Sequence, residues 1–388
     1  MRYKLGKIFN LQMGKTPDRH SPKFWNEGTE PWISIADLTK CNKYIENTAE
    51  KITATAVDES GIKIIPKNTV IMSFKLSIGK VAITPKEMYS NEAIMSFIDK
   101  GVLKIEPVYL YYLLMHKDWD TGTNKAVMGK TLNKATLSQM TVNIHGYSEQ
   151  LEIIKALDAA SSIIAARKQQ LTELDNLIKA RFVEMFVATD AASDWPYCTI
   201  ADVSNDMRTG PFGSALHHDE FVDSGVFVLG IDNAVENKFS YNRMRYITAE
   251  KYQELKRYTV YPGDVIITIM GTVGRSAVIP ADMPKAINTK HLACITPNAK
   301  MVNAQFLSCA FQVHPDIRAQ LQKQCKGAIM DGLNLTIIKG LSFHIPPINL
   351  QDRFVGFYEQ VDKSKVAVQK ALDEAQLLFD SLMQKYFG

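Results

Sequence analysis

Residues 148–187, SEQLEIIKALDAASSIIAARKQQLTELDNLIKARFVEMFV, decide the architecture of this 388-residue chain. Ten positions from Ile153 to Met185, spaced alternately four and three residues apart, include seven aliphatic or methionine residues, and the stretch contains no Pro or Gly. An apolar repeat every 3.5 residues over this length is typical of a coiled-coil helix. Such a helix would extend about 60 Å, and one small domain cannot cover its apolar seam. The stretch therefore predicts a second helix as its partner.

The C-terminal stretch, residues 348–388, has the same periodicity and supplies that partner. Arg167, Arg181 and Lys365 interrupt the two seams and can fix the register of the pair. The predicted seam residues are Ile153, Leu157, Ile164, Leu171, Leu174, Ile178, Phe354, Tyr358, Val361, Val368, Leu372, Phe379 and Leu382. Because one helix links two globular blocks and the other ends the chain, we expect them to pair in antiparallel. The alternative is that each helix folds onto its own block.

An internal repeat divides the rest of the chain. The pattern of strand, tight Gly turn carrying a cation, and strand at residues 66–83 recurs at residues 262–278. Matching residues 201 positions apart are Leu132 and Leu333, Asn133 and Asn334, Gln150 and Gln351, and Phe186 and Phe387. A domain-sized period indicates a tandem duplication rather than a solenoid.

The predicted fold class is therefore α+β, with two mixed α/β domains in tandem, each followed by a long helix, and pseudo-two-fold symmetry. The expected parts are a first block at 1–147, a helix at 148–187, a linker at 188–194, a second block at 195–347 and a helix at 348–388. Apolar stretches bounded by Gly, Pro and Asn predict strands at 70–74, 81–84, 94–98, 140–144, 265–270 and 341–345. Short helices are expected near 107–116 and 303–313.

Composition and charge exclude several classes of protein. The net charge is +4, with 20 Lys and Arg against 14 Asp and Glu in the first block and 15 against 13 in the second. Such an excess can neutralise phosphates but does not identify a nucleic-acid-binding protein by itself. No apolar run approaches the length of a membrane span. The five cysteines are widely spaced without a C-x-x-C pair, so we expect a cytoplasmic protein without a disulfide framework and without a membrane.

The chain lacks a recognisable catalytic or metal-binding motif. Gly129-Lys130-Thr131 has Asn124 where a phosphate-binding loop requires Gly, and His217-His218-Asp219-Glu220 lacks the ligand spacing of a zinc site. A nucleophile elbow and a methyltransferase motif are also missing. We therefore predict no catalytic residue and no metal.

Short loops in both blocks instead combine Gly, cations, hydroxyls, amides and aromatic residues. The sequences MGKTP at 13–17, FW at 24–25 and PWIS at 31–34 resemble the opening of a target-recognition domain in the specificity subunit of a type I restriction–modification system. The sequence TGPFGSALH at 209–217 resembles another common opening in that family. One departure is Lys15, which stands where the opening often carries a second Gly. With the duplication and the two long helices, the resemblance covers essentially the whole chain.

The resemblance implies a subunit without catalysis that reads an asymmetric, bipartite sequence in double-stranded DNA. Two modification subunits would use S-adenosylmethionine to methylate adenine in each half, and two restriction subunits using ATP and Mg would join them. This chain itself would bind no cofactor. The coiled coil would set the length of the unread spacer between the half-sites.

Polar residues in the matching loops are the candidates for contact with DNA. Arg and Asn are suited to base edges and Lys to phosphates. The predicted DNA-binding residues are Lys15, Thr16, Arg19, Lys75, Ser77, Lys80, Lys130 and Asn133 in the first block, and Arg208, Ser214, His217, His218, Thr272, Arg275, Lys326 and Asn334 in the second. An alternative function is a coiled-coil scaffold that binds only other proteins.

Overall fold

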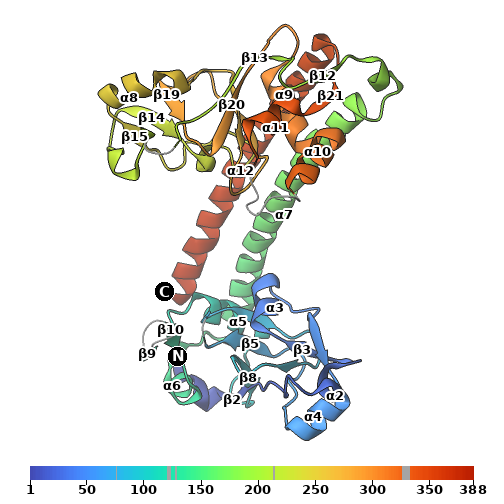
Figure 1. The fold of residues 1–388 in the computed structure, drawn as a ribbon. Helices are drawn as coiled ribbons and strands as arrows, with labels where there is room; N and C mark the ends of the chain where they lie inside the picture. The colour runs from blue at the N-terminus through green and yellow to red at the C-terminus, as the bar shows by residue number, and fades with distance from the viewer. Residues whose placement is uncertain (76, 120–123, 127–128, 213–214, 326–332) are drawn as a thin grey trace. The chain divides into compact units, whose positions relative to one another are not determined.

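The computed structural model describes the chain except residues 76, 120–123, 127–128, 213–214 and 326–332 (Figure 1). It consists of two compact units, one formed by Met1–Lys168 with Lys370–Gly388 and the other by Gln169–Gln369. Each unit contains one globular domain and parts of both long helices.

Two sheets form the first domain. Strands β2 (Phe9–Met13), β8 (Ile94–Asp99), β5 (Val70–Ser73) and β6 (Val81–Ile83) pair in that order in an antiparallel sheet. The smaller sheet has the order β4 (Glu50–Ile52), β3 (Glu30–Ile33) and β7 (Tyr89–Ser90), with β3 and β7 parallel. Separate pairs join β1 (Arg2–Lys4) to β11 (Thr141–Asn143) and β9 (Asn124–Ala126) to β10 (Gly129–Thr131).

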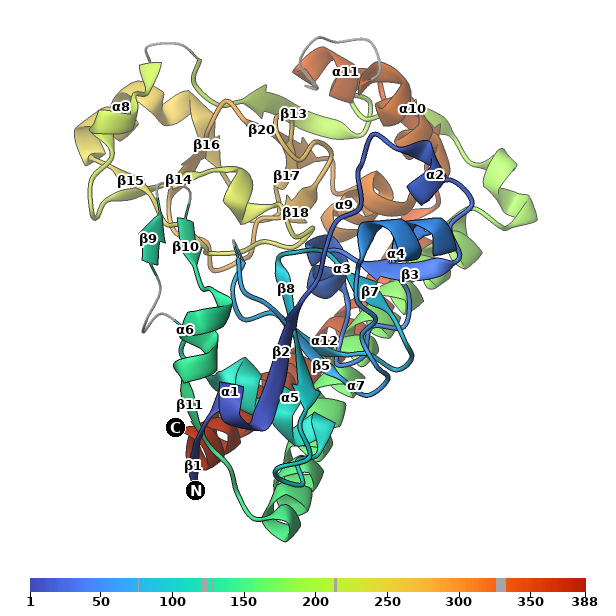
Figure 2. The ribbon, with the colours of Figure 1, turned by 90° about the horizontal axis from the view of Figure 1, so that it is seen from below.

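The helices of the first domain lie between these strands in sequence. They are α1 (Leu5–Ile8), α2 (Pro22–Trp25), α3 (Ile35–Lys40), α4 (Ala54–Ser60), α5 (Pro107–His116) and α6 (Lys134–Gln139). Figure 2 shows α6 beside α1, where the Leu5 amide donates to the Met140 carbonyl at 2.8 Å. The expected helix at 107–116 coincides with α5.

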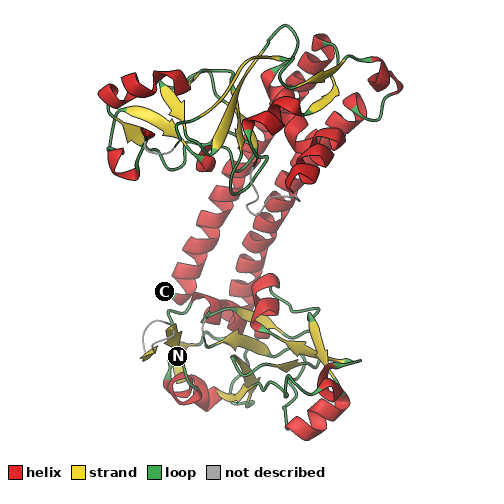
Figure 3. Ribbon diagram, in the orientation of Figure 1, coloured by secondary structure: helices red, strands yellow, loops and turns green. Residues whose placement is uncertain are grey.

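The second domain repeats this plan. Its larger antiparallel sheet has the order β13 (Ser204–Thr209), β20 (Leu292–Pro297), β17 (Val265–Thr268) and β18 (Ser276–Val278). The other sheet has the order β15 (Tyr246–Ile247), β14 (Val226–Leu229), β19 (Ala286–Asn288) and β16 (Thr259–Val260), with β14 and β19 parallel. A separate pair joins β12 (Tyr197–Thr199) to β21 (Ser342–His344). The helices are α8 (Ala249–Leu255), α9 (Ala304–Val313), α10 (Pro315–Cys325) and α11 (Leu335–Gly340) (Figure 3).

Both faces of the central strands are buried, which explains their continuous apolar sequences. Successive side chains of a strand point to opposite faces. In β5, Val70 and Met72 belong to the cluster that includes α5 and the start of the first long helix, whereas Ile71 belongs to the cluster between the two sheets. In β17, Val265 and Ile267 likewise belong to one hydrophobic cluster and Ile266 to another.

Each long helix has in its first turn a buried glutamine that ties it to the preceding domain. The helices are α7 (Tyr147–Phe186) and α12 (Ile348–Phe387). The Gln150 amide group donates to the carbonyls of Lys104 and His145 and accepts from the Glu106 amide, at 3.1–3.2 Å. Gln351 makes the equivalent bonds at 2.8–3.0 Å. The repeat of this glutamine in the sequence therefore marks a repeated helix anchor.

Within each unit, the parts of α7 and α12 that it contains pack against each other in antiparallel orientation. In the first unit, Ile153 and Leu157 near the start of α7 share a hydrophobic cluster with Met383 near the end of α12. In the second unit, Phe182 near the end of α7 packs against Phe354 near the start of α12, with ring centroids 5.4 Å apart. The seam residue Lys365 forms an ion pair with Asp175 at 2.5 Å.

All the predicted seam residues are buried or half-buried. The fully buried ones are Ile153, Leu157, Ile178, Phe354, Val361 and Val368, and the half-buried ones are Ile164, Leu171, Leu174, Tyr358, Leu372, Phe379 and Leu382. Tyr358 and Leu174 also pack against the second domain's core, and Phe379 and Leu382 against the first domain's core. The seam is therefore shared between helix pairing and attachment to the domains.

Candidate nucleic-acid interface

Four segments meet at one edge of the first domain, where strands of both sheets end. The Lys15 amide, just after β2, donates to the Ser90 carbonyl at the end of β7 at 2.8 Å. The Phe74 amide, just after β5, donates to the Ala93 carbonyl, and the Leu132 amide, just after β10, donates to the Phe74 carbonyl, both at 3.0 Å. We call the described residues of these segments (14–19, 74–75, 77–80, 90–93, 124–126 and 129–132) the first edge.

The second domain has a matching edge made by residues 209–212, 269–275, 288–291 and Leu333. The Ile269 amide donates to the His291 carbonyl and the Leu333 amide donates to the Ile269 carbonyl, both at 2.9 Å. Backbone groups make these bonds, so the edge is preserved while its side chains differ between the domains.

Glycine is required in the loop after β2 and in the matching loop after β13, where each loop lies against the backbone at the end of a strand of the smaller sheet. A Cβ atom added at Gly14 would lie 2.3 Å from the Ser90 carbonyl oxygen, and one added at Gly210 would lie 2.2 Å from the Asn288 carbonyl oxygen. Such distances exclude any side chain unless the backbone shifts. This close approach accounts for Gly in both loop sequences.

The tight turns of the two edges have the same construction. In the first, the Ser73 hydroxyl donates to the Ser77 carbonyl and accepts from the Lys80 amide at 3.1 Å. In the second, the Thr268 hydroxyl donates to the Thr272 carbonyl and accepts from the Arg275 amide at 2.9 Å. Ser77 therefore corresponds to Thr272, and Lys80 to Arg275.

The cations of the turns differ in their side-chain contacts. The Lys80 ammonium donates to the Thr39 hydroxyl at 2.8 Å. The Arg275 side chain is exposed, and no described residue forms a hydrogen bond or ion pair with its guanidinium group. Lys75, the other candidate cation of the first turn, is half-buried and lies over the Phe74 ring at 5.4 Å.

Intramolecular contacts hold the loop after β2. The Arg19 guanidinium lies 4.0 Å from the ring centroid of Trp25 and 4.6 Å from that of Trp32, and forms an ion pair with Glu50. The Lys15 ammonium donates to the Ser60 carbonyl. The Thr16 hydroxyl donates to the Glu92 carboxylate. The first edge thus brings Lys15, Thr16 and Arg19 onto one loop.

The repeated asparagines have a local structural role. The Asn133 side chain accepts from the Thr136 amide at 2.8 Å and begins α6, and the Asn334 side chain accepts from the Ile337 amide at 2.9 Å and begins α11. Asn is among the preferred residues for capping a helix N-terminus. Their recurrence is explained by these caps, without a contact to a base.

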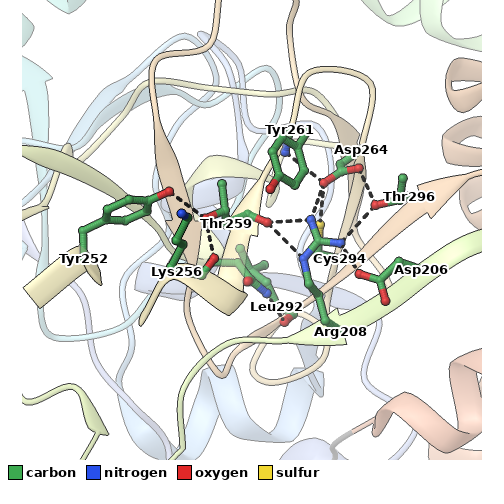
Figure 4. Close-up of polar contacts among 11 residues, drawn as sticks. Asp206, Arg208, Tyr252, Lys256, Thr259, Tyr261, Asp264, Leu292, Cys294 and Thr296 are labelled. Carbon is green, nitrogen blue, oxygen red and sulfur yellow. Dashed lines mark hydrogen bonds and ion pairs between the residues drawn. The ribbon is translucent and has the colours of Figure 1, made fainter. Parts of the chain in front are cut away.

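Arg208 differs from the prediction because the domain uses its whole guanidinium group (Figure 4). Its side chain is 13% exposed. It donates to the Thr259 carbonyl, the carboxylates of Asp206 and Asp264, and the Thr296 hydroxyl, at 2.6–3.0 Å. These five contacts match the five N–H groups of an arginine. We therefore assign Arg208 to the interior of the fold rather than to base reading.

The histidine-rich segment of the second domain forms a turn. The His217 amide donates to Glu220 at 2.6 Å, Glu220 pairs with Lys251 at 2.7 Å, and His218 packs edge-on against Phe221. Both histidines are exposed. Among the described residues no group of three His, Cys, Asp or Glu is placed to hold a metal ion.

Some of the predicted residues are only partly covered by the structure. Ser214 and Lys326 lie outside the described residues, and Lys130 is described only as part of strand β10.

Sequence reasoning missed the loops that lead into β8 and β20. Glu92 lies in the first loop, and Lys290 and His291 lie in the second. Nearby, Arg245 pairs with Asp232 at 2.6 Å. Burial, followed by the charges of Lys290 and Arg245, lowers the pKa of His291. The two loops, SNEAI at 90–94 and NTKHL at 288–292, share no residue, so the sequence carried no signal that matched them.

The same loops hold buried polar atoms without a partner among the described residues. They are Ser90 Oγ in the first domain, and Asn288 Oδ1 and Thr289 Oγ1 in the second. Buried polar groups are normally hydrogen-bonded. The fourth such atom among the described residues is Ser96 Oγ in β8, so three of the four lie in these loops.

Comparisons with known proteins point to one family. The family model described as "Type I restriction modification DNA specificity domain" matches residues 1–176 and 193–375. The type I restriction enzyme MjaIX specificity subunit of Methanocaldococcus jannaschii is 22% identical over 401 aligned positions, covering 98% of this chain and 91% of that protein. No described helix has the length and apolar character needed to cross a membrane.

Two solved structures share the fold. The S subunit of a type I restriction–modification system from M. genitalium superposes with a TM-score of 0.56 at 14% identity, over 100% of this chain and 96% of that one. A chain from a structure concerned with complex assembly and conformational transition of the type I R-M system gives a TM-score of 0.60 at 14% identity, over 99% and 96% of the two chains.

Proposed function

Because the chain belongs to the type I restriction–modification DNA specificity family, we propose that its two domains read the two unequal halves of one bipartite DNA target. The observation that carries this proposal is the construction of the edges. The same backbone bonds build both, at Phe74 and Ile269, whereas the side chains on them differ. A shared frame with different side chains suits two readers of different sequences.

The chemistry of the edges suits contact with duplex DNA. Lys15, Lys75, Lys80 and Arg275 supply cations to phosphates or guanine edges, and Thr16, Ser77 and Thr272 supply hydroxyls. Direct reading of bases requires such groups to enter a groove, and the major groove distinguishes all four base pairs. Each small edge alone gives limited discrimination, and joining two in one chain raises the effective concentration of the second contact.

The paired helices then set the distance between the half-sites. A helix has a fixed rise per residue, so a coiled coil is a suitable spacer between two readers of one duplex. Removing one heptad from the middle of each helix should shorten the preferred spacer and leave both half-sites unchanged. A change in half-site identity instead would contradict this role.

Catalysis belongs to partner subunits in this proposal. Two modification subunits carrying S-adenosylmethionine would methylate adenine in each half-site. Two restriction subunits using ATP and Mg would translocate and cleave DNA. The chain itself binds no cofactor and serves as the non-catalytic reader on which they assemble.

The test is sequence-selective methylation by a reconstituted complex. The chain is combined with its modification subunits, the methylated positions are mapped, and binding to the mapped target is measured against salt concentration. We expect a bipartite motif and an affinity that falls as salt rises, since phosphate contacts release counterions. Equal binding to all duplexes, or binding only to protein partners, would favour the scaffold alternative.

A further inference from the structure

The first edge carries an exposed carboxylate among its cations. Glu92 follows β7, and the Thr16 hydroxyl donates to its Oε2 atom. This hydrogen bond lowers the pKa of Glu92, and the charges of Lys75 and Arg19 act in the same direction. No described cation lies within ion-pair distance of it, so the carboxylate remains ionised and unneutralised by direct contact.

Such a group is unfavourable near DNA unless it meets a donor. An ionised carboxylate accepts hydrogen bonds and cannot donate them, and it is repelled by the phosphates that the neighbouring lysines attract. The donors exposed in the major groove are the amino groups of cytosine and adenine. The adenine amino group lies beside the N7 acceptor of its own ring, which would face a carboxylate oxygen, whereas the cytosine amino group lies beside a C–H. Cytosine is therefore the better partner.

The second domain has the opposite charge at the matching position. The equivalent backbone bonds to Ala93 and His291 align SNEAI at 90–94 with NTKHL at 288–292, so Lys290 occupies the place of Glu92. The backbone around the two positions is the same, because Phe74 bonds to Ala93 as Ile269 bonds to His291. A lysine only donates and suits phosphates or the acceptors of guanine. The reversal of charge on a common frame is what a difference in base preference requires.

From this placement we propose that Glu92 is a specificity-determining residue that accepts a hydrogen bond from the amino group of a cytosine in the half-site read by the first domain. Thr16 is the positioning residue that aims the carboxylate. This inference rests on the proposed function and names one base contact within it.

The experiment uses the complete complex with modification subunits and duplexes carrying the mapped target. Each cytosine of the first half-site is replaced in turn by 2-pyrimidinone, which lacks the amino group. One replacement should weaken binding by the wild-type complex roughly tenfold. The same replacement should have little effect on the Glu92→Ala complex.

The Glu92→Gln variant gives a second, directional readout. Glutamine presents both a donor and an acceptor and pairs with the N6 and N7 atoms of adenine. At the affected position, Glu92→Gln should therefore shift the base preference from cytosine towards adenine. Thr16→Val removes the hydroxyl that donates to Glu92 and should weaken the preference for cytosine. Thr16→Ser keeps the hydroxyl and should retain that preference. Glu87→Gln is the matched control, since Glu87 is an exposed glutamate before β7 rather than after it.

Unchanged base preferences in both Glu92 variants would overturn the inference, as would a first half-site without a C·G pair. Failure of the proposed function gives a different result, because the wild-type complex would then bind all duplexes alike. A change confined to the second half-site would also overturn the assignment of Glu92 to the first.

Discussion

The two domains share a backbone plan but differ in the polar layer beneath their edges. In the second domain Arg208 is paired in register with Cys294 across β13 and β20, and in the first Gln12 is paired with Ser96 across β2 and β8. Asp264 precedes β17 and is fully buried against Arg208 at 2.6 Å. In the first domain this layer is neutral, and Gln12 donates to the Ile64 carbonyl at 2.8 Å.

This difference shows which interactions the fold depends on. Backbone bonds and the two apolar faces of the central strands are common to both domains, so they are sufficient to specify the sheets. At this position the ion pair belongs to the second domain, where the Asp264 carboxylate also accepts from the Thr296 hydroxyl and the Cys294 thiol. Burial raises the pKa of Cys294 and keeps it protonated as a donor. A frame that tolerates such divergence inside can also tolerate it on the edge.

Removing the buried carboxylate of Asp264 should produce the largest difference in stability between the two domains. Asp264→Ala leaves the Arg208 charge with only the exposed Asp206 as a carboxylate partner, which we expect to destabilise the second domain by about 3–5 kcal/mol. Thr69→Ala, just before β5 in the first domain, should cost about 1 kcal/mol. Hydrogen exchange of the full chain measures both effects. Amide protection in β17 and β20 reports on the second domain, and amide protection in β5 and β8 reports on the first.

A double variant tests whether the loss comes from an unpaired charge. Arg208→Met combined with Asp264→Leu removes both charges and should recover much of the protection, because apolar pairs can replace buried ion pairs. Equal losses in the single and double variants would mean that packing, not charge, explains the effect.

Removing the glutamine anchor should instead destabilise the two domains by similar amounts. Gln150→Ala and Gln351→Ala each remove a buried side chain that bonds three backbone groups. We expect each to cost about 2–3 kcal/mol, since buried groups lose their partners. Gln169→Ala, on the exposed face of α7, should cost under about 0.5 kcal/mol. Protection of the first turns of α7 and α12 is the readout, and a large effect in one domain alone would contradict a shared anchor.

The turn cations Lys80 and Arg275 should differ in what they contribute to DNA binding. Lys80 already donates to Thr39, whereas Arg275 is exposed. Arg275→Ala should therefore weaken binding of the complex by about 1–3 kcal/mol and relax one position of the second half-site. Lys80→Ala should cost under about 1 kcal/mol, alike for all sequences, with a weaker dependence on salt. Titration with matched and mismatched duplexes separates these outcomes, and a relaxed first half-site in Lys80→Ala would reverse the assignment.

The periodic parts of the fold could be predicted from the sequence. The duplication, the mixed α/β class, the strands around 70–74 and 265–270 and the two long helices all follow from repeated apolar patterns, because periodicity records which faces are buried. The extra strands of the smaller sheets, such as the two-residue β7, were not predicted. Such short pairings depend on distant parts of the chain and leave little local pattern.

Roles of individual side chains were harder to predict for the same reason. An arginine and an asparagine in a loop have the same sequence signature whether they contact DNA, form an ion pair or cap a helix. Arg208 and Asn133 were assigned to DNA because the residues that engage them, Asp264 and the Thr136 amide, could not be placed beside them from the sequence. Conversely, the sequence did not suggest Glu92, for which we propose a contact with cytosine, because a carboxylate alone does not indicate DNA binding.

The smallest expected difference between the domains is their response to acid. His314 is buried after α9, contacts the rings of Phe182 and Phe343, and its Nδ1 accepts from the Asp316 amide at 3.3 Å. Burial lowers the pKa of His314; the His344 charge acts the same way and the Asp316 charge opposes it. The folded domain therefore binds this proton less readily than the unfolded chain. Its contribution to stability is complete above the unfolded pKa of about 6.5 and declines as the pH falls below it.

The first domain has Lys117 after the equivalent helix α5, so it lacks this buried imidazole. Lowering the pH from 7 to 5 should reduce hydrogen-exchange protection more in α9 and β21 than in α5 and β11. His314→Asn keeps an acceptor for the Asp316 amide and should remove part of the difference. His291, whose pKa is also lowered, accounts for a further part, which the double variant with His291→Asn should remove. A parallel decline in both domains would show that general charge repulsion, rather than these histidines, governs the response.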